Sequence, residues 1–193
     1  FAGDIQVRGT TFIKANSNGN NIAIGTNAGT TVQGTNTVAI GALAGNASQN
    51  TYAVAIGREA GQTAQGTKSI AIGLQAGETA QGTHSVAIGN QAGLEGQNNF
   101  AIAIGTNAGC RGQDGTVAIG GSAGREEQGD DAIAIGPSAG SASQGASAVA
   151  IGHDAGCNAQ GEHAVAVGYQ AGRVSQNNFA VAVGREAGCN AQG

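Results

Sequence analysis

The three cysteines are the residues of this chain best suited to redox chemistry. Cys110, Cys157 and Cys189 each follow an Ala-Gly pair, so they occupy the same place in a sequence repeat. If successive repeats stack as neighbouring strands ~4.8 Å apart, Cys157 and Cys189 lie ~9.6 Å apart, beyond the ~7 Å between Cα atoms that a disulfide tolerates. We therefore expect no intrachain disulfide. The thiols either crosslink neighbouring protomers or stay free, and we favour free thiols.

Histidine, carboxylate and thiol groups occur within a few residues of one another at His153, Asp154 and Cys157. A zinc site needs converging ligands, and no second set converges on these three. His84 and His163 share one repeat position but are five repeats apart. The sequence shows no Ser/His/Asp arrangement, no paired carboxylates and no phosphate-binding loop before a helix. We therefore expect no metal, no cofactor and no enzyme activity.

The composition is not that of an ordinary globular core. The 193 residues include 36 Gly, one Pro, no Met and no Trp. The net charge of −4 is spread without runs of one sign, which disfavours nucleic acids and anionic membranes as partners. No apolar stretch approaches the ~20 residues that span a bilayer, so we expect no membrane insertion in this segment.

The element that must position all these side chains is a repeated motif, seen in Val54-Ala55-Ile56-Gly57-Arg58-Glu59-Ala60-Gly61. It consists of a Val/Ile-Ala-Val/Ile triplet, a glycine, two varying residues and Ala-Gly, and it occurs eleven times at a step of 16 residues with one step of 15. The frequent glycines exclude helix, whereas the triplet suits a short strand. The sequence predicts an all-β fold, a parallel β-solenoid or β-roll of eleven coils of 16 residues.

A glutamine stands eight residues after the triplet glycine in every repeat. Stacked coils would place these amides directly above one another, so we expect a structural ladder in which each side chain donates to the next. The predicted ladder consists of Gln33, Gln49, Gln65, Gln81, Gln97, Gln113, Gln128, Gln144, Gln160, Gln176 and Gln192.

The triplet has two apolar faces, because its Val/Ile pair and its central Ala point to opposite sides of a strand. If the pair points inward, the alanines form an outer stripe on the order of 500 Å², which is large for a monomer. If the coil is too narrow for the pair, Ala points inward and the Val/Ile face is outside. Both alternatives predict self-association. The candidate alanine stripe consists of Ala39, Ala55, Ala71, Ala87, Ala103, Ala118, Ala134, Ala150, Ala166 and Ala182.

Two regions depart from the repeat. Residues 1–21 contain alternating segments at 4–8 and 11–14 that read as two strands, and we expect them to cap the solenoid of residues 22–193. The single 15-residue step precedes Val117, and we expect the turn to absorb the loss because a one-residue slip would invert the strand. The last repeat breaks off at Gly193, so we expect a processed product or a piece of a longer protein with an uncapped, continuing end.

The triplet-glycine motif resembles the head repeats of trimeric autotransporter adhesins, and similar repeats occur in fibre-like proteins of large DNA viruses and phages. The likeness covers residues 22–193. The sequence departs from the family's pattern in its regular 16-residue step, its Ala-Gly pair and its glutamine column. The resemblance implies a left-handed parallel β-roll, a homotrimer, and a location on a cell or virion surface, outside the cell.

The leading hypothesis is a structural, non-enzymatic fibre or adhesin-head segment whose chains associate as a homotrimer or an end-to-end filament. A second hypothesis is binding of a cell-surface receptor or glycan by a varying column of Asn36, Tyr52, Lys68, His84, Phe100, His163 and Phe179. A weaker third hypothesis is ice binding by the ladder of Thr35, Thr51, Thr67 and Thr83, which continues with non-threonine residues.

Overall fold

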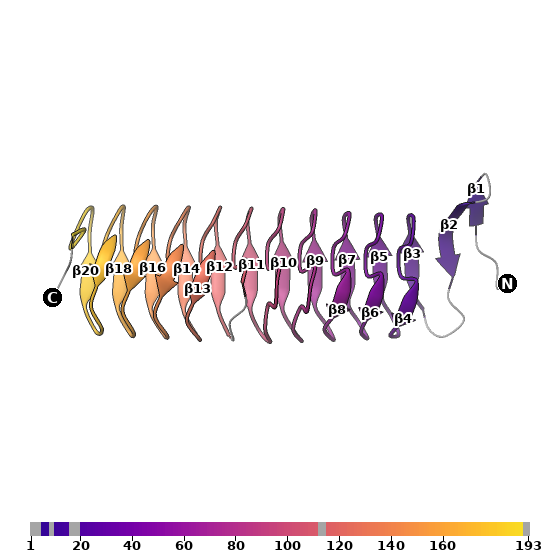
Figure 1. The fold of residues 1–193 in the computed structure, drawn as a ribbon, viewed down its shortest axis with the longest axis horizontal. Helices are drawn as coiled ribbons and strands as arrows, with labels where there is room; N and C mark the ends of the chain where they lie inside the picture. The colour runs from indigo at the N-terminus through magenta and orange to yellow at the C-terminus, as the bar shows by residue number, and fades with distance from the viewer. Residues whose placement is uncertain (1–4, 8–9, 16–19, 112–114, 191–193) are drawn as a thin grey trace.

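The solenoid consists of three-residue strands separated by glycine turns. The structure is a computed structural model, and it describes residues 5–7, 10–15, 20–111 and 115–190. Figure 1 shows the coils side by side in one row, with the two ends of the chain at opposite ends of the rod. The predicted all-β parallel solenoid with repeats 16 residues apart is confirmed. No described residue is helical, and no helix that could span a membrane occurs among them.

The triplets form one continuous sheet along the rod. Neighbouring strands are parallel and in register, so that Val54, Ala55 and Ile56 pair with Ile70, Ala71 and Ile72. The strands of this sheet are β3 (Ile22–Ile24), β5 (Val38–Ile40), β7 (Val54–Ile56), β9 (Ile70–Ile72), β10 (Val86–Ile88), β11 (Ile102–Ile104), β12 (Val117–Ile119), β14 (Ile133–Ile135), β16 (Val149–Ile151), β18 (Val165–Val167) and β20 (Val181–Val183).

The opposite side of seven coils carries a second strand, also of three residues, that ends at the repeat's glutamine. These strands form a three-stranded sheet of β4 (Thr31–Gln33), β6 (Ala47–Gln49) and β8 (Thr63–Gln65), and a four-stranded sheet of β13 (Glu126–Gln128), β15 (Ala142–Gln144), β17 (Asn158–Gln160) and β19 (Val174–Gln176). Isolated parallel bridges continue the row from Thr63 through Thr79 and Glu95 to Arg111. We call this side the opposite face, and the outer side of the triplet sheet the Val/Ile face.

At the N-terminal end two antiparallel strands precede the first coil. They are β1 (Ile5–Val7) and β2 (Thr10–Ala15), which pair with each other, and β2 also pairs antiparallel with β3. The ends of the expected segment 4–8 and its connection through Gly9 lie outside the described residues.

The core of the rod is made of alanine. The central alanines of the triplets point inward and are at most 7% exposed, and they meet a second column formed by the alanines of the Ala-Gly pairs. The space between the two faces is so narrow that a Cβ placed on Gly61 would lie 2.6 Å from the side-chain carbon of Gln65. A pair of β-branched side chains cannot fit there.

The expected outer alanine stripe is therefore wrong, and the other alternative holds. Its ten members, from Ala39 to Ala182, are between 0 and 2% exposed and belong to the core. The Val/Ile pairs lie outside because the buried glutamines and two columns of alanine methyl groups already fill the narrow space between the faces.

A third core column was not recognised in the sequence. The residue immediately before each triplet is buried in most coils, as for Thr37, Ala53, Ser69 and Ser85. Apart from Asn21 before the first triplet, this position holds only Ala, Ser or Thr, which is the signal that could have revealed it.

The 15-residue step leaves the triplet sheet undisturbed. Strand β11 pairs with β12 in the common register, Ile102 with Val117 and Ile104 with Ile119. The expectation that the connection before Val117 absorbs the missing residue is confirmed.

Candidate functional sites on the rod surface

The Val/Ile face is the most extended uniform surface of the molecule. Two β-branched side chains from every triplet point outward, stacked on those of the neighbouring coils. In the middle of the rod they are half-buried, and at its last strand Val181 and Val183 are 60% and 65% exposed. None of the positions in these two columns carries a charge.

The Val/Ile face is large enough to matter for association. Ten steps of ~4.8 Å and a width of ~10 Å give an area on the order of 500 Å², near the largest apolar patch of a typical monomer. Within one chain, each of these side chains is covered only by its counterparts on the two neighbouring coils. Covering them from outside would remove more apolar surface from water, at about 25 cal/mol per Å².

The glutamine column lies inside the rod. Gln33 is half-buried, the other described members of the column are buried, and Gln113 and Gln192 lie outside the described residues. Each buried amide donates to the carbonyl of the first triplet residue of its own coil, as Gln65 Nε2 does to Val54 O at 2.8 Å. The same bond joins Gln49 to Val38, Gln81 to Ile70, Gln97 to Val86, Gln128 to Val117, Gln144 to Ile133, Gln160 to Val149 and Gln176 to Val165.

Bonds between successive glutamines accompany these backbone bonds in part of the column. Gln65 donates to Gln81 Oε1 at 3.2 Å, and the same contact joins Gln81 to Gln97 and Gln160 to Gln176. Among the glutamines that the structure describes, five buried side-chain oxygens accept no hydrogen bond, those of Gln49, Gln65, Gln128, Gln144 and Gln160. The column is therefore chiefly a brace between the two sides of a coil, which the expected ladder did not include.

The cysteines lie in one column on the opposite face, half-buried and free. Burial raises the pKa of the Cys110 thiol, the carboxylate of Glu95 raises it further, and the guanidinium groups of Arg111 and Arg125 oppose both. Because the thiolate is the reactive form, this thiol is a poor nucleophile at neutral pH.

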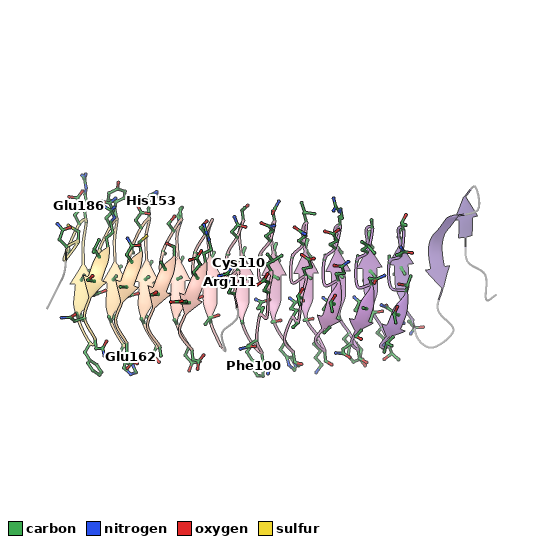
Figure 2. The ribbon with its side chains drawn as sticks, viewed as in Figure 1. Phe100, Cys110, Arg111, His153, Glu162 and Glu186 are labelled. Atoms are coloured by element: carbon green, nitrogen blue, oxygen red, sulfur yellow. The ribbon has the colours of Figure 1, made fainter. Side chains whose placement is uncertain are left out.

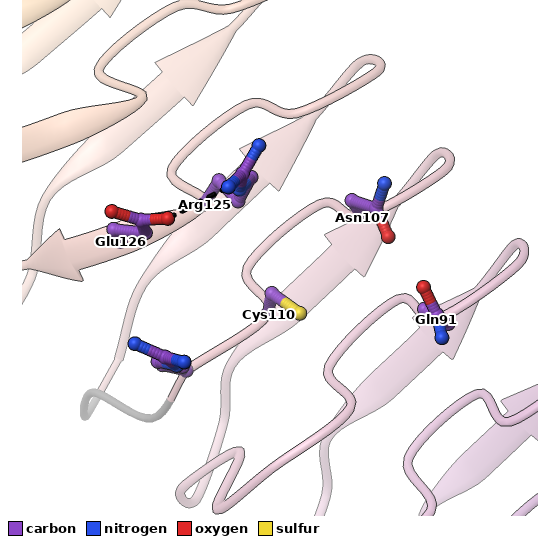
Figure 3. A pocket seen from close by; sticks show the side chains of 6 residues that line it. Gln91, Asn107, Cys110, Arg125 and Glu126 are labelled. Carbon is purple, nitrogen blue, oxygen red and sulfur yellow. Dashed lines mark hydrogen bonds and ion pairs between the residues drawn. The ribbon is translucent and has the colours of Figure 1, made fainter.

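A polar hollow of about 310 Å³ opens beside Cys110. Figure 3 shows its lining, Gln91, Asn107, Cys110, Arg111, Arg125 and Glu126. Arg125 is paired with Glu126 at 2.8 Å, whereas Arg111 forms no ion pair with any described residue. The hollow offers hydrogen-bond donors to a polar ligand, and the one carboxylate among its described lining residues, that of Glu126, is paired with Arg125.

The histidines stack on aromatic rings of the next coil. His153 lies against Asp154, with 3.1 Å between Nδ1 and Oδ2, and its ring stacks on Tyr169 at 5.5 Å. Among the described residues, no three His, Cys, Asp or Glu side chains are grouped so as to hold a metal ion. Figure 2 places His153 and Glu186 on one long edge of the rod, and Phe100 and Glu162 on the other.

The varying column runs along the edge that bears Phe100. His84 stacks on Phe100 with 5.3 Å between ring centroids and 7° between planes, and His163 stacks on Phe179 with 5.3 Å and 14°. The two phenylalanines are 67% and 72% exposed. The structure thus brings these histidines into aromatic pairs rather than into a shared site.

Comparison with known protein families gives a match to the coils themselves. The family model described as "YadA head domain repeat (2 copies)" matches residues 22–44, 64–92, 128–155 and 143–171. Curated proteins and solved structures give no match. The matched segments all consist of triplets, glycine turns and glutamine columns, so the similarity concerns the coil as a building unit.

Proposed function

We propose, from the premise that these coils are YadA head repeats of the trimeric autotransporter adhesin type, that the chain is a structural adhesin-head segment that associates with its own copies. The observation that carries the proposal is the uncharged Val/Ile face, which extends over all eleven triplets. The segment works outside the cell, on a cell or virion surface, through shape and attachment, without catalysis.

Lateral association through this face favours a closed trimer over an end-to-end filament. Contacts at the ends of the rod would leave the whole Val/Ile face in water. Three rods packed around one axis each turn that face inward, and the assembly closes without further open surfaces. The polar and varying opposite face then remains available for attachment.

Two further roles follow for parts of the chain. Residues 1–21 cap the first coil of the 22–193 solenoid, because β2 pairs with the outer edge of β3 and occupies its hydrogen-bonding groups. The glutamine column fixes the distance between the two sides of each coil, because it bonds across the core to backbone carbonyls. Both roles are structural.

The test is the mass of the chain in solution by sedimentation equilibrium. Ile88 lies on the Val/Ile face and Thr79 on the opposite face, so Ile88→Lys and Thr79→Lys add the same charge on two sides of the rod. We expect trimers for the unaltered chain and for Thr79→Lys, and monomers for Ile88→Lys because a buried unpaired ammonium is costly. An unaltered chain that stays monomeric at all concentrations would refute the proposal.

A further inference from the structure

The edge of the rod beside Phe100 contains a hollow that the regular repeat does not produce. One face of the Phe100 ring is covered by His84 of the preceding coil. On the following coil the equivalent corner is Gly115, which lies in the shortened connection before Val117 and has no side chain. The second face of the ring therefore opens into a hollow of about 310 Å³, lined by Asn99, Phe100, Gly115 and Asp131.

Gly115 is the residue that keeps the hollow open. Its φ of +64° lies in the left-handed region, where glycine is most easily accommodated. A Cβ at this position would collide with the carboxylate oxygen Oδ1 of Asp131. With glycine here, the Asp131 carboxylate lies against residue 115 and forms one wall of the hollow that the Phe100 ring also lines.

The walls of the hollow combine three kinds of contact. The ring of Phe100 supplies a flat apolar surface, and Asp131 supplies a carboxylate that accepts hydrogen bonds. Asn99 is held in place because its Oδ1 accepts a bond from the backbone N–H of Thr83 at 2.8 Å. Its Nδ2 group is thereby left to donate to a ligand.

Phe100 is not at this corner for the sake of folding. Its φ of 59° is unusual for a bulky residue, and a side chain that is 67% exposed gains little from burial. Other coils place residues as different as Asn36, Tyr52 and Phe179 at the equivalent corner in the same conformation, so this φ belongs to the coil and is not special to Phe100. What distinguishes the Phe100 ring is the hollow that it lines.

We propose that this hollow binds a neutral pyranose ring of a glycan. A pyranose presents C–H groups on its faces and hydroxyls around its rim, which match the Phe100 ring, the Asn99 donor and the Asp131 acceptor. The volume lies at the lower end of small-molecule sites, which suits one or two sugar rings. A quaternary or primary ammonium group would also meet an aromatic ring and a carboxylate, but aromatic cages surround such cations with several rings.

The inference deepens the attachment part of the proposed function by giving it a ligand class and a site. The experiment uses the full chain on an array of neutral and acidic glycans. Titration with methyl galactopyranoside and methyl glucopyranoside follows, observed through the side-chain amide NMR signal of Asn99. We expect a neutral saccharide to bind and to shift that signal.

Matched variants locate the binding. Phe100→Ala should weaken binding at least about tenfold. Phe179→Ala should leave it unchanged, because Phe179 stacks in the same way on His163 but does not line this hollow. Asn99→Asp keeps the oxygen that accepts from Thr83 N and loses the donor, so it should weaken binding without lowering the melting temperature.

Two outcomes would overturn the inference. The first is no saccharide binding, or equal binding by Phe100→Ala and the unaltered chain. The second is binding of tetramethylammonium or a lysine peptide in place of sugars, together with a strong loss of that binding in Asp131→Asn. The amide oxygen of this variant still accepts a hydrogen bond from a hydroxyl but no longer attracts a cation. Sedimentation of the same samples keeps the proposals separate, because trimers without saccharide binding refute this inference alone.

Discussion

The two faces of each coil share one core and one period, yet they are built by different rules. The Val/Ile face carries the same kinds of side chain in every coil and forms a single sheet along the solenoid. The opposite face varies from Thr79 to Glu95 to Arg111 in successive coils, and its strands are divided between two short sheets. Both faces border the same alanines, so contact with the core does not explain why only one of them is constant. The proposed association through the Val/Ile face would explain the difference.

The largest effect should come from the glycine that ends each triplet. Gly89 has a φ of +133°, and a Cβ there would lie 2.6 Å from the carbonyl oxygen of Gly105 in the next coil. Gly89→Ala should lower the free energy of unfolding by about 3 kcal/mol, because it combines backbone strain with a backbone collision. Denaturant unfolding measures this change.

Gly121→Ala is the matched control for this prediction. Gly121 follows the equivalent glycine of a later coil, and a Cβ there would have nothing within 4 Å. Its substitution should stabilise the chain by about 0.4–1 kcal/mol, through the unfolded state. Equal effects of the two substitutions would mean that the close approach between coils does not limit this turn.

The next largest effect should come from the brace between the two faces. Gln65→Ala removes the bonds to Val54 O and to Gln81 and leaves a cavity in the core. We expect a loss of about 2–3 kcal/mol in unfolding free energy. Gln62→Ala, at a half-buried position on the opposite face, should change it by less than about 0.5 kcal/mol. If the two substitutions lower the unfolding free energy equally, the brace has no special role.

The smallest effect should come from removing a carboxylate charge on the opposite face. Partial burial raises the pKa of Glu78, the carboxylates of Glu59 and Glu95 raise it further, and Arg58 opposes them. The folded state therefore holds this proton more tightly than the unfolded state. The stability this gives is present below the ordinary glutamate pKa and is lost as pH rises through the raised pKa.

Glu78→Gln should accordingly stabilise the chain above that pH window, by less than about 1 kcal/mol because the site is only partly buried and solvent screens its charge. Below the window the substitution should have no effect. Thermal unfolding at several pH values checks this, and 1 M salt should shrink the part that comes from the neighbouring carboxylates. A gain that is the same at all pH values would contradict the electrostatic cause.

The repeat was sufficient to predict the solenoid and its register, because a fixed step with a fixed apolar triplet allows stacking in one alignment only. It was not sufficient to decide which side of Val54-Ala55-Ile56 faces the core. The alternation of side chains along a strand places Val54 and Ile56 on one face. This pattern is the same whether that face points inward or outward. The width of the coil decides, and that width depends on small residues such as Ser69, whose column was overlooked.

The corners of the coil could not be predicted from the sequence. In most coils three non-glycine residues adopt the left-handed conformation, including Val32, Leu43 and Phe100. Their types vary freely, so no pattern marks them. Bonds between coils hold them in place, as when Tyr52 N donates to Thr35 O at 2.9 Å. The hollow beside Phe100 was missed for the same reason, because it depends on the space that Gly115 leaves between two corners.

The direction of the backbone hydrogen bonds between coils has a mechanical consequence. Bonds such as Gly57 N to Ile40 O join one coil to the next along the length of the rod. A pulling force on the two ends of the chain therefore acts on all of these interfaces in series. The weakest interface opens first, so the coils should come away one at a time. Each released turn of 16 residues would lengthen the chain by roughly 50 Å. Regular steps of that size in force spectroscopy would show a tether that yields in small increments under load, whereas one abrupt rupture would show the opposite.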